Sequence, residues 1–107
     1  LDVPLPDQTE DDQFLESIEE HLIQIWHFAP DLILYQAGVD PLKTDRLGRL
    51  SVSHEGLKAR DYMVLEGARR RGIPVSMAIG GGYADPITDT VMAYANTYKV
   101  AKDIYKF

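Results

Sequence analysis

Apolar residues recur at the spacing of a helix in three parts of the chain, which predicts three amphipathic helices. These helices are expected over residues 10–29, 53–71 and 85–105. Acidic residues crowd the start of the first helix, as the helix dipole favours. The positions expected to face inward are Phe14, Leu15, Ile18, Leu22, Ile25 and Trp26 in the first helix, Leu57, Tyr62, Val64, Leu65 and Ala68 in the second, and Ile87, Val91, Tyr94, Ala95, Tyr98, Ala101 and Tyr105 in the third.

The ends of the predicted helices carry residues typical of helix termini. Pro30 stops the first helix, and Ser53 is expected to be the N-cap of the second. Gly72 suits the position just after the second helix, where a left-handed backbone is common. Asp85 is expected to cap the third helix, with Pro86 at its first position.

Two short apolar runs, residues 31–37 and 74–79, predict buried β-strands. A polar loop follows the first run and extends from Gly38 to about Ser53. The order helix, strand, helix, strand, helix contains a βαβ unit, so the strands should be parallel and joined by a right-handed crossover. Such strands need cover on both faces, and a sheet this small leaves at least one edge open. An α/β fold is therefore expected.

A length of 107 residues suits one small domain or a piece of a larger one. No cysteine is present, which excludes disulfides and thiolate metal sites. No run approaches the roughly 20 apolar residues of a membrane span, and residues 1–12 lack the features of a signal peptide. The chain does not begin with Met, which favours a processed product or an excised fragment. We expect a soluble protein of the cytoplasm, or of the nucleus in a eukaryotic source.

The net charge of −6 is unevenly distributed. Residues 1–42 contain ten acids and no Lys or Arg, whereas residues 43–107 contain seven acids and eleven bases. The one tight basic cluster is residues 69–71, where arginines complement the dipole at the end of the second helix. A nucleic-acid-binding protein needs a broad basic face with interleaved aromatics, so we expect no direct contact with nucleic acid.

Asp40 and Tyr83 carry the most evident chemistry. Each follows a predicted strand, and the ends of neighbouring parallel strands lie about 4.8 Å apart at the sheet edge where open α/β proteins place their active sites. A carboxylate there can hold a metal, and a phenol can stabilise an oxyanion. Taken alone, Asp40 and Asp45 are more simply turn aspartates that accept backbone hydrogen bonds, and Tyr83 is more simply a packed aromatic.

Glycines 80–82, directly before Tyr83, most simply form a turn with positive φ. A phosphate cradle is a weaker alternative, because neither Gly-x-Gly-x-x-Gly nor a P-loop sequence is present. His21, His27 and His54 are not spaced as metal ligands on one helix face, and we expect them at the surface.

Two motifs stand out together with their mutual spacing. They are Pro30 to Ser51, containing Gln36-Ala37-Gly38-Val39-Asp40-Pro41, and Ile73 to Tyr83, ending in Gly80-Gly81-Gly82-Tyr83. Together they resemble the histone deacetylase family of the arginase/deacetylase superfamily, and the lead-in Val3-Pro4-Leu5-Pro6 also resembles this family. Two further segments, Asp45-Arg46-Leu47-Gly48 and Arg60-Asp61, are most similar to the class IV and bacterial deacetylase-like enzymes. The resemblance covers residues 1–107 as the C-terminal portion of a deacetylase-like domain.

The resemblance implies part of a three-layer α/β fold with a parallel sheet, and zinc-dependent removal of an acyl group from lysine or a related amine. Asp40 would match one of the family's zinc ligands, and Tyr83 the tyrosine that hydrogen-bonds the oxyanion. Leu47 would line the substrate tunnel, and the backbone of Gly81 and Gly82 would form part of the pocket wall. The family's catalytic histidines and other zinc ligands belong to an earlier part of the domain. We therefore expect the isolated chain to be inactive and to bind zinc weakly or not at all.

A second interpretation is a non-catalytic α/β interaction module that pairs its open sheet edge with a partner or with a second copy of itself. A phosphate or nucleotide binder at residues 80–82 ranks third. Within the enzyme interpretation, the substrate stays open between acetyl-lysine in proteins, longer acyl-lysines, acetylpolyamines and small acetylated metabolites.

Overall fold

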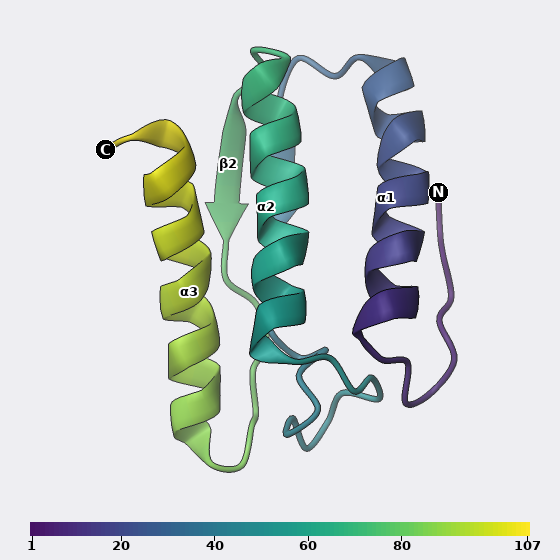
Figure 1. Cartoon of the computed structure of the whole chain (residues 1–107), viewed down its shortest axis with the longest axis vertical. Helices are drawn as coiled ribbons and strands as arrows, with labels where there is room; N and C mark the ends of the chain where they lie inside the picture. The colour runs from purple at the N-terminus through teal and green to yellow at the C-terminus, as the bar shows by residue number, and fades with distance from the viewer.

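The structure, a computed structural model, describes residues 1–107 and consists of three helices and two strands (Figure 1). Their order is the predicted one, although each strand is shorter than its apolar run. None of the helices is both long and apolar enough to span a membrane. The elements are α1 (Asp11–Phe28), β1 (Ile33–Gln36), α2 (His54–Arg70), β2 (Val75–Ala78) and α3 (Ile87–Tyr105).

The two strands pair in parallel, from Ile33 beside Val75 to Gln36 beside Ala78. α2 connects them and lies over one face of the sheet, with α1 and α3 on either side of α2 (Figure 1). This arrangement is the predicted βαβ unit with one helix added at each end. Because the sheet contains β1 and β2 alone, the outer edge of each strand is open, as predicted.

Helices cover only one face of this sheet. Tyr35 and Met77 lie half-buried on the face toward α2 and α3, whereas Leu34 on the opposite face is 77% exposed. Leu32 and Ile79, next to the strand ends, add to the open apolar surface. The expectation that both faces are covered is therefore wrong for this chain, because no element packs on the side of Leu34.

Three of the four predicted helix termini are confirmed and one is wrong. α1 ends at Phe28 with Ala29 as its C-cap, directly before Pro30. The Ser53 hydroxyl accepts a hydrogen bond from the Gly56 N–H at 3.0 Å, as an N-cap does. Gly72, just beyond α2, has a left-handed backbone with φ of 68°. Asp85 does not cap α3, because Pro86 itself is extended and occupies the N-cap position, so the helix begins one residue later than expected.

The inward face of α3 differs from its predicted apolar stripe. Its buried residues are Thr90, Ala93, Thr97 and Ala101, while Ile87, Val91 and Tyr98 of the predicted stripe are exposed. The two threonines can be buried because both find partners. Thr90 Oγ1 accepts from the Ala84 N–H at 3.1 Å, and Thr97 Oγ1 donates to the Asp61 carboxylate at 2.6 Å.

The core lies between the helices and the loop that follows β1. Val39, Leu42 and Val52 belong to this loop and are almost completely buried. The loop that carries Asp40 is therefore anchored in the core. The six residues of the central cluster are Phe14, Val39, Leu42, Val52, Leu57 and Ala93.

In α1 and α2, two further residues that were expected to face inward are exposed instead. Tyr62 is 56% exposed, because its side of α2 faces a hollow beside the C-terminal end of α3. Ile25 is 38% exposed, because α1 packs mainly against α2 and its outer side meets no other element.

Ser53 also joins α1 to α2, which makes its contribution to stability testable. Its hydroxyl donates to the Asp11 carboxylate, and its N–H donates to the same carboxylate at 2.7 Å. We predict that Ser53→Ala lowers the free energy of unfolding by about 1–2 kcal/mol, measured by urea denaturation with circular dichroism. Ser17→Ala, on α1 and outside this network, is the control and should change it by less than about 0.5 kcal/mol. Equal effects of the two substitutions would contradict the cap assignment.

Candidate functional site

Two loops meet beyond the C-terminal ends of β1 and β2. Backbone hydrogen bonds connect them, from the Arg46 N–H to the Tyr83 carbonyl and from the Asp85 N–H to the Thr44 carbonyl, both at 3.0 Å. An isolated antiparallel bridge pairs Asp45 with Ala84 between the same loops. The loop after β1 and the loop after β2 thus form one connected surface at the sheet edge where the sequence predicts chemistry.

This surface contains a cavity of about 230 Å³. Four of the five predicted site residues line it, including Asp40 from one loop and Tyr83 from the other. Gly82 does not line it, because the space beside its Cα is filled by Thr90 and Val39. The cavity is lined by Gln36, Asp40, Leu47, Gly48, Gly80, Gly81 and Tyr83.

Asp40 and Asp45 lie in the same loop but in opposite environments. Asp40 is exposed at the cavity, and its carboxylate accepts no hydrogen bond from the chain. Asp45 is only 8% exposed, and its carboxylate accepts several backbone hydrogen bonds. The interpretation as a turn aspartate therefore fits Asp45 and does not fit Asp40, whose oxygens are free to bind a ligand.

The Asp45 carboxylate holds the two loops together. Its Oδ1 accepts from the N–H groups of Leu47 at 2.9 Å and Gly48 at 2.8 Å. Its Oδ2 accepts from the N–H of Tyr83, in the other loop, at 2.8 Å. Burial by itself would raise the pKa of Asp45, but these backbone N–H groups outweigh it and place the pKa below its ordinary value. Sequence reasoning recognised the turn aspartate but missed its contact with Tyr83, which is remote in sequence.

Tyr83 is held by its backbone and leaves its ring free. Its N–H donates to Asp45 and its carbonyl accepts from Arg46, while the side chain is 50% exposed and lines the cavity. The interpretation of Tyr83 as a packed aromatic does not fit this position. A phenol held in this way can donate a hydrogen bond to a group bound beside Asp40.

Tyr94 of α3 fixes the glycine turn before Tyr83. Its hydroxyl accepts from the Gly80 N–H at 3.0 Å and lies 2.8 Å from the Gly80 carbonyl oxygen. Gly81 and Gly82 have φ of 72° and 103°, as the sequence predicts for a glycine turn. Because the Gly80 N–H is already bonded, a phosphate cradle would lack one of its donors. The helical periodicity assigned Tyr94 to the apolar stripe of α3 and did not indicate this role of its hydroxyl.

Gly48 must be a glycine because of Asp40. A Cβ on Gly48 would lie 1.9 Å from the carbonyl oxygen of Asp40, which is far inside van der Waals contact. The Gly48 N–H is one of the groups that Asp45 holds. The fixed position of Gly48 therefore supports the backbone of Asp40 from the same side as Asp45.

The histidines lie away from the cavity. His21 Nδ1 is 2.7 Å from the Ser17 carbonyl oxygen within α1, and His54 Nε2 is 3.8 Å from Asp89 at the start of α3. No group of three or more His, Asp or Glu side chains is placed to hold a metal ion. Asp40 thus belongs to no such group within residues 1–107.

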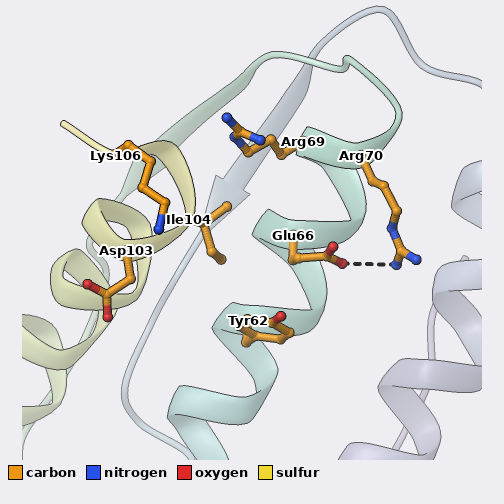
Figure 2. Close-up of a pocket in the computed structure, with 7 residues that line it drawn as sticks. All are labelled: Tyr62, Glu66, Arg69, Arg70, Asp103, Ile104 and Lys106. Carbon is orange, nitrogen blue, oxygen red and sulfur yellow. Dashed lines mark hydrogen bonds and ion pairs between the residues drawn. The ribbon is translucent and has the colours of Figure 1, made fainter.

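A second hollow, of about 390 Å³, lies at the opposite end of the strands, between the C-terminal ends of α2 and α3 (Figure 2). Arg70 there pairs with Glu66 at 2.9 Å. Arg69 lies over the Tyr105 ring and Arg71 over the Trp26 ring. Each arginine of the cluster thus has a partner within the chain, and the hollow mixes charges of both signs. It is lined by Tyr62, Glu66, Arg69, Arg70, Asp103, Ile104 and Lys106.

Comparison with known proteins identifies the family. Residues 1–98 match the histone deacetylase domain, so the chain belongs to the histone deacetylase family. An uncharacterized protein of Picosynechococcus sp. is 40% identical over 106 residues, which are 98% of this chain and 35% of that protein. Histone deacetylase 2 of Arabidopsis thaliana is 40% identical over 76 residues, which are 70% of this chain and 20% of that protein.

Solved structures show the same fold. The crystal structure of acetylpolyamine aminohydrolase from Burkholderia pseudomallei superposes with a TM-score of 0.82 at 21% identity, covering 97% of this chain and 29% of that one. The chain is therefore α/β and adopts part of the arginase/deacetylase fold. It spans about a third of the length of this structure and of the Picosynechococcus relative.

The depressed pKa of Asp45 predicts how the stability of the protein depends on pH. The charged carboxylate stabilises the fold above the unfolded pKa of about 3.9, and this contribution is lost as the pH falls through the lower folded pKa. We predict that Asp45→Asn lowers the free energy of unfolding by about 1.5–3 kcal/mol at neutral pH. The difference in the free energy of unfolding between Asp45→Asn and the wild-type protein should become smaller below a pH of about 4.

Asp40→Asn is the matched control for this experiment. Asp40 lies in the same loop and bears the same charge but accepts no hydrogen bond, so its substitution should change the free energy by less than about 0.5 kcal/mol. Urea denaturation across a pH series measures both variants. A pH-independent effect of Asp45→Asn would contradict the assigned role of its charge.

Proposed function

We propose that this chain is the C-terminal portion of the catalytic domain of a zinc-dependent deacetylase, which removes an acyl group from lysine or a related amine. The observation that carries the proposal is the cavity in which Asp40 and Tyr83 come together from two different loops. In a chain of the histone deacetylase family, a free carboxylate beside a free phenol suits amide hydrolysis at a metal site.

Asp40 would supply one carboxylate oxygen to the zinc ion. Catalytic zinc is usually held by three protein ligands with one position open, and carboxylate oxygens are suitable ligands. The exposed, unbonded carboxylate of Asp40 fits one of these positions, and the other ligands would come from outside residues 1–107. Zinc, when bound, polarises the amide carbonyl and lowers the pKa of water.

Tyr83 would donate a hydrogen bond to the oxyanion that forms when the amide carbonyl is attacked. A phenol hydroxyl is a hydrogen-bond donor and suits an oxygen that becomes negatively charged. Because Asp45 and Arg46 fix the Tyr83 backbone, the hydroxyl needs little reorganisation during the reaction. One such donor typically contributes about 3–4 kcal/mol to lowering the barrier.

Leu47 and the backbone of Gly81 would form a wall beside the reacting amide. Leu47 is 71% exposed although apolar, and it lines the same cavity as Asp40. An exposed leucine at this place suits contact with the aliphatic part of an acylated lysine or amine. Gly82 would act indirectly, because its backbone packs against Thr90 and Val39 behind the wall.

The names of two similar proteins support this class of substrate. One is a histone deacetylase and the other an acetylpolyamine aminohydrolase. Both names describe enzymes that act on an acylated amine. Acylated lysine in proteins and acylated polyamines therefore stay alternative substrates in this proposal.

The open sheet favours a second candidate function, a non-catalytic interaction module. Leu34 is 77% exposed on the uncovered face, and neither strand has a neighbour on its outer side. Such a surface can pair with a partner protein or with a second copy of the chain. Self-association of the chain, with no deacetylase activity after the preceding portion of the domain is added, would favour this second function.

The isolated chain should not bind zinc tightly, because Asp40 stands alone as a donor. Isothermal titration calorimetry of residues 1–107 with Zn²⁺ should show no stoichiometric tight binding. Asp40→Asn should give the same weak signal as the wild-type chain. Stoichiometric tight binding that is lost in Asp40→Asn would contradict this prediction.

Adding the preceding portion of the domain as a separate polypeptide should restore deacetylation of an acetyl-lysine peptide. We predict that Tyr83→Phe lowers the restored rate constant by about 10²- to 10³-fold, because the oxyanion loses its donor. Tyr62→Phe is the control, since Tyr62 on α2 is similarly exposed and does not line the cavity. A Tyr83→Phe variant as active as the control, or stable homodimerisation with no restored activity, would contradict the proposed function.

A further inference from the structure

Arg60 and Asp61, neighbours on α2, form a buried ion pair behind the cavity. Their exposed fractions are 8% and 1%, and Arg60 Nη2 lies 2.9 Å from Asp61 Oδ1. Burying two charges is costly unless further hydrogen bonds satisfy both groups. The partners of this pair therefore indicate why it is placed here.

Asp61 is held from three elements. Its carboxylate accepts from the Tyr35 hydroxyl of β1, from Thr97 Oγ1 of α3 at 2.6 Å, and from Arg60 Nε at 3.0 Å. Burial raises the pKa of Tyr35, so its hydroxyl stays protonated and available as a donor. Arg60 and Tyr35 bond Oδ1, whereas Thr97 bonds Oδ2, so the oxygen that orients the guanidinium of Arg60 is not the one that Thr97 holds.

The guanidinium extends from Asp61 to the loop that carries Asp40. Arg60 Nη1 donates to the Gly38 carbonyl oxygen at 2.7 Å. Gly38 lies against the Asp40 side chain, since a Cβ on Gly38 would be 3.1 Å from Asp40 Oδ1. The same Cβ would be 2.8 Å from the Gly80 carbonyl oxygen, so Gly38 is also in contact with the glycine turn before Tyr83.

We propose that Arg60 is a positioning residue for the metal ligand Asp40: Asp61 fixes the guanidinium, and the guanidinium fixes the Gly38 carbonyl and with it the direction of the Asp40 carboxylate. This inference rests on the proposed function. A planar guanidinium can bond Asp61 through Nε and Gly38 through Nη1 at once, whereas a lysine ammonium cannot reproduce that fork.

A purely structural ion pair would behave differently. The Asp61 carboxylate makes contacts in two directions. On one side it bonds Arg60, which in turn bonds the Gly38 carbonyl, and on the other it bonds Thr97 of α3, away from the cavity. If the ion pair only stabilised the fold, loss of either contact, Arg60 to Gly38 or Asp61 to Thr97, would weaken zinc binding in proportion to the loss in free energy of unfolding. If Arg60 positions Asp40, only loss of the contact between Arg60 and Gly38 should weaken zinc binding by more than the loss in stability explains.

The experiment compares Arg60→Met with Thr97→Val in the full-length protein. Two properties are measured, the zinc dissociation constant by chelator competition and the visible absorption spectrum of the Co²⁺-substituted protein, alongside unfolding of the metal-free form. We expect Arg60→Met to raise the zinc dissociation constant by about 10- to 100-fold and to shift the Co²⁺ spectrum. Thr97→Val should lower stability and leave both metal properties unchanged.

Arg60→Lys serves if Arg60→Met does not fold, because it keeps the charge but loses the fork, and the same changes are expected. Folded Arg60 variants with wild-type zinc affinity and Co²⁺ spectrum would overturn the inference. Zinc affinity that falls equally in Thr97→Val would also overturn it. A wild-type protein that binds no zinc would instead contradict the proposed function, so the two failures are distinguishable.

Discussion

The Asp45 carboxylate is the interaction on which the candidate site depends. It accepts hydrogen bonds from backbone N–H groups of both loops, within its own loop from Leu47 and Gly48 and across to Tyr83. It adds to the two backbone hydrogen bonds that connect the loops after β1 and β2, and it is the side chain that bonds the backbone of both. With it, the backbone of Tyr83 is fixed relative to the loop that carries Asp40. A charged acceptor is suited to this because it satisfies several buried donors at once.

The chain contains three aspartates near the site, and burial assigns them different tasks. Asp45 and Asp61 are buried and hydrogen-bonded, the first to backbone N–H groups and the second to side chains of three elements. Asp40 is exposed with its oxygens unbonded, at the cavity that also contains Tyr83. Two carboxylates thus stabilise the frame, while the third stays free to bind a ligand. This division supports a metal-binding role for Asp40 more directly than its position in the sequence does.

The sequence predicted those features that depend on local interactions. The order of elements, the Ser53 cap, the Gly72 turn and the positive φ of Gly81 and Gly82 follow from periodicity and from the chemistry of single residues. The parallel βαβ unit then brought Asp40 and Tyr83 to one edge of the sheet, where the structure has them. The predicted inward face of α3 was wrong. Hydrogen bonds from Ala84 to Thr90 and from Thr97 to Asp61 allow both threonines to be buried, and helical periodicity does not indicate such bonds.

The distinction between Asp40 and Asp45 likewise required the structure. Both are loop aspartates, and the burial of Asp45 and its contact with the Tyr83 N–H, which is remote in sequence, cannot be inferred from the residue type. The most direct test of this distinction is anomalous diffraction at the zinc edge from crystals of the full-length protein. We predict a zinc peak about 2.0–2.2 Å from a carboxylate oxygen of Asp40, on the side of the cavity that Tyr83 lines. A zinc peak at Asp45, or none at Asp40 in the zinc-loaded protein, would contradict it.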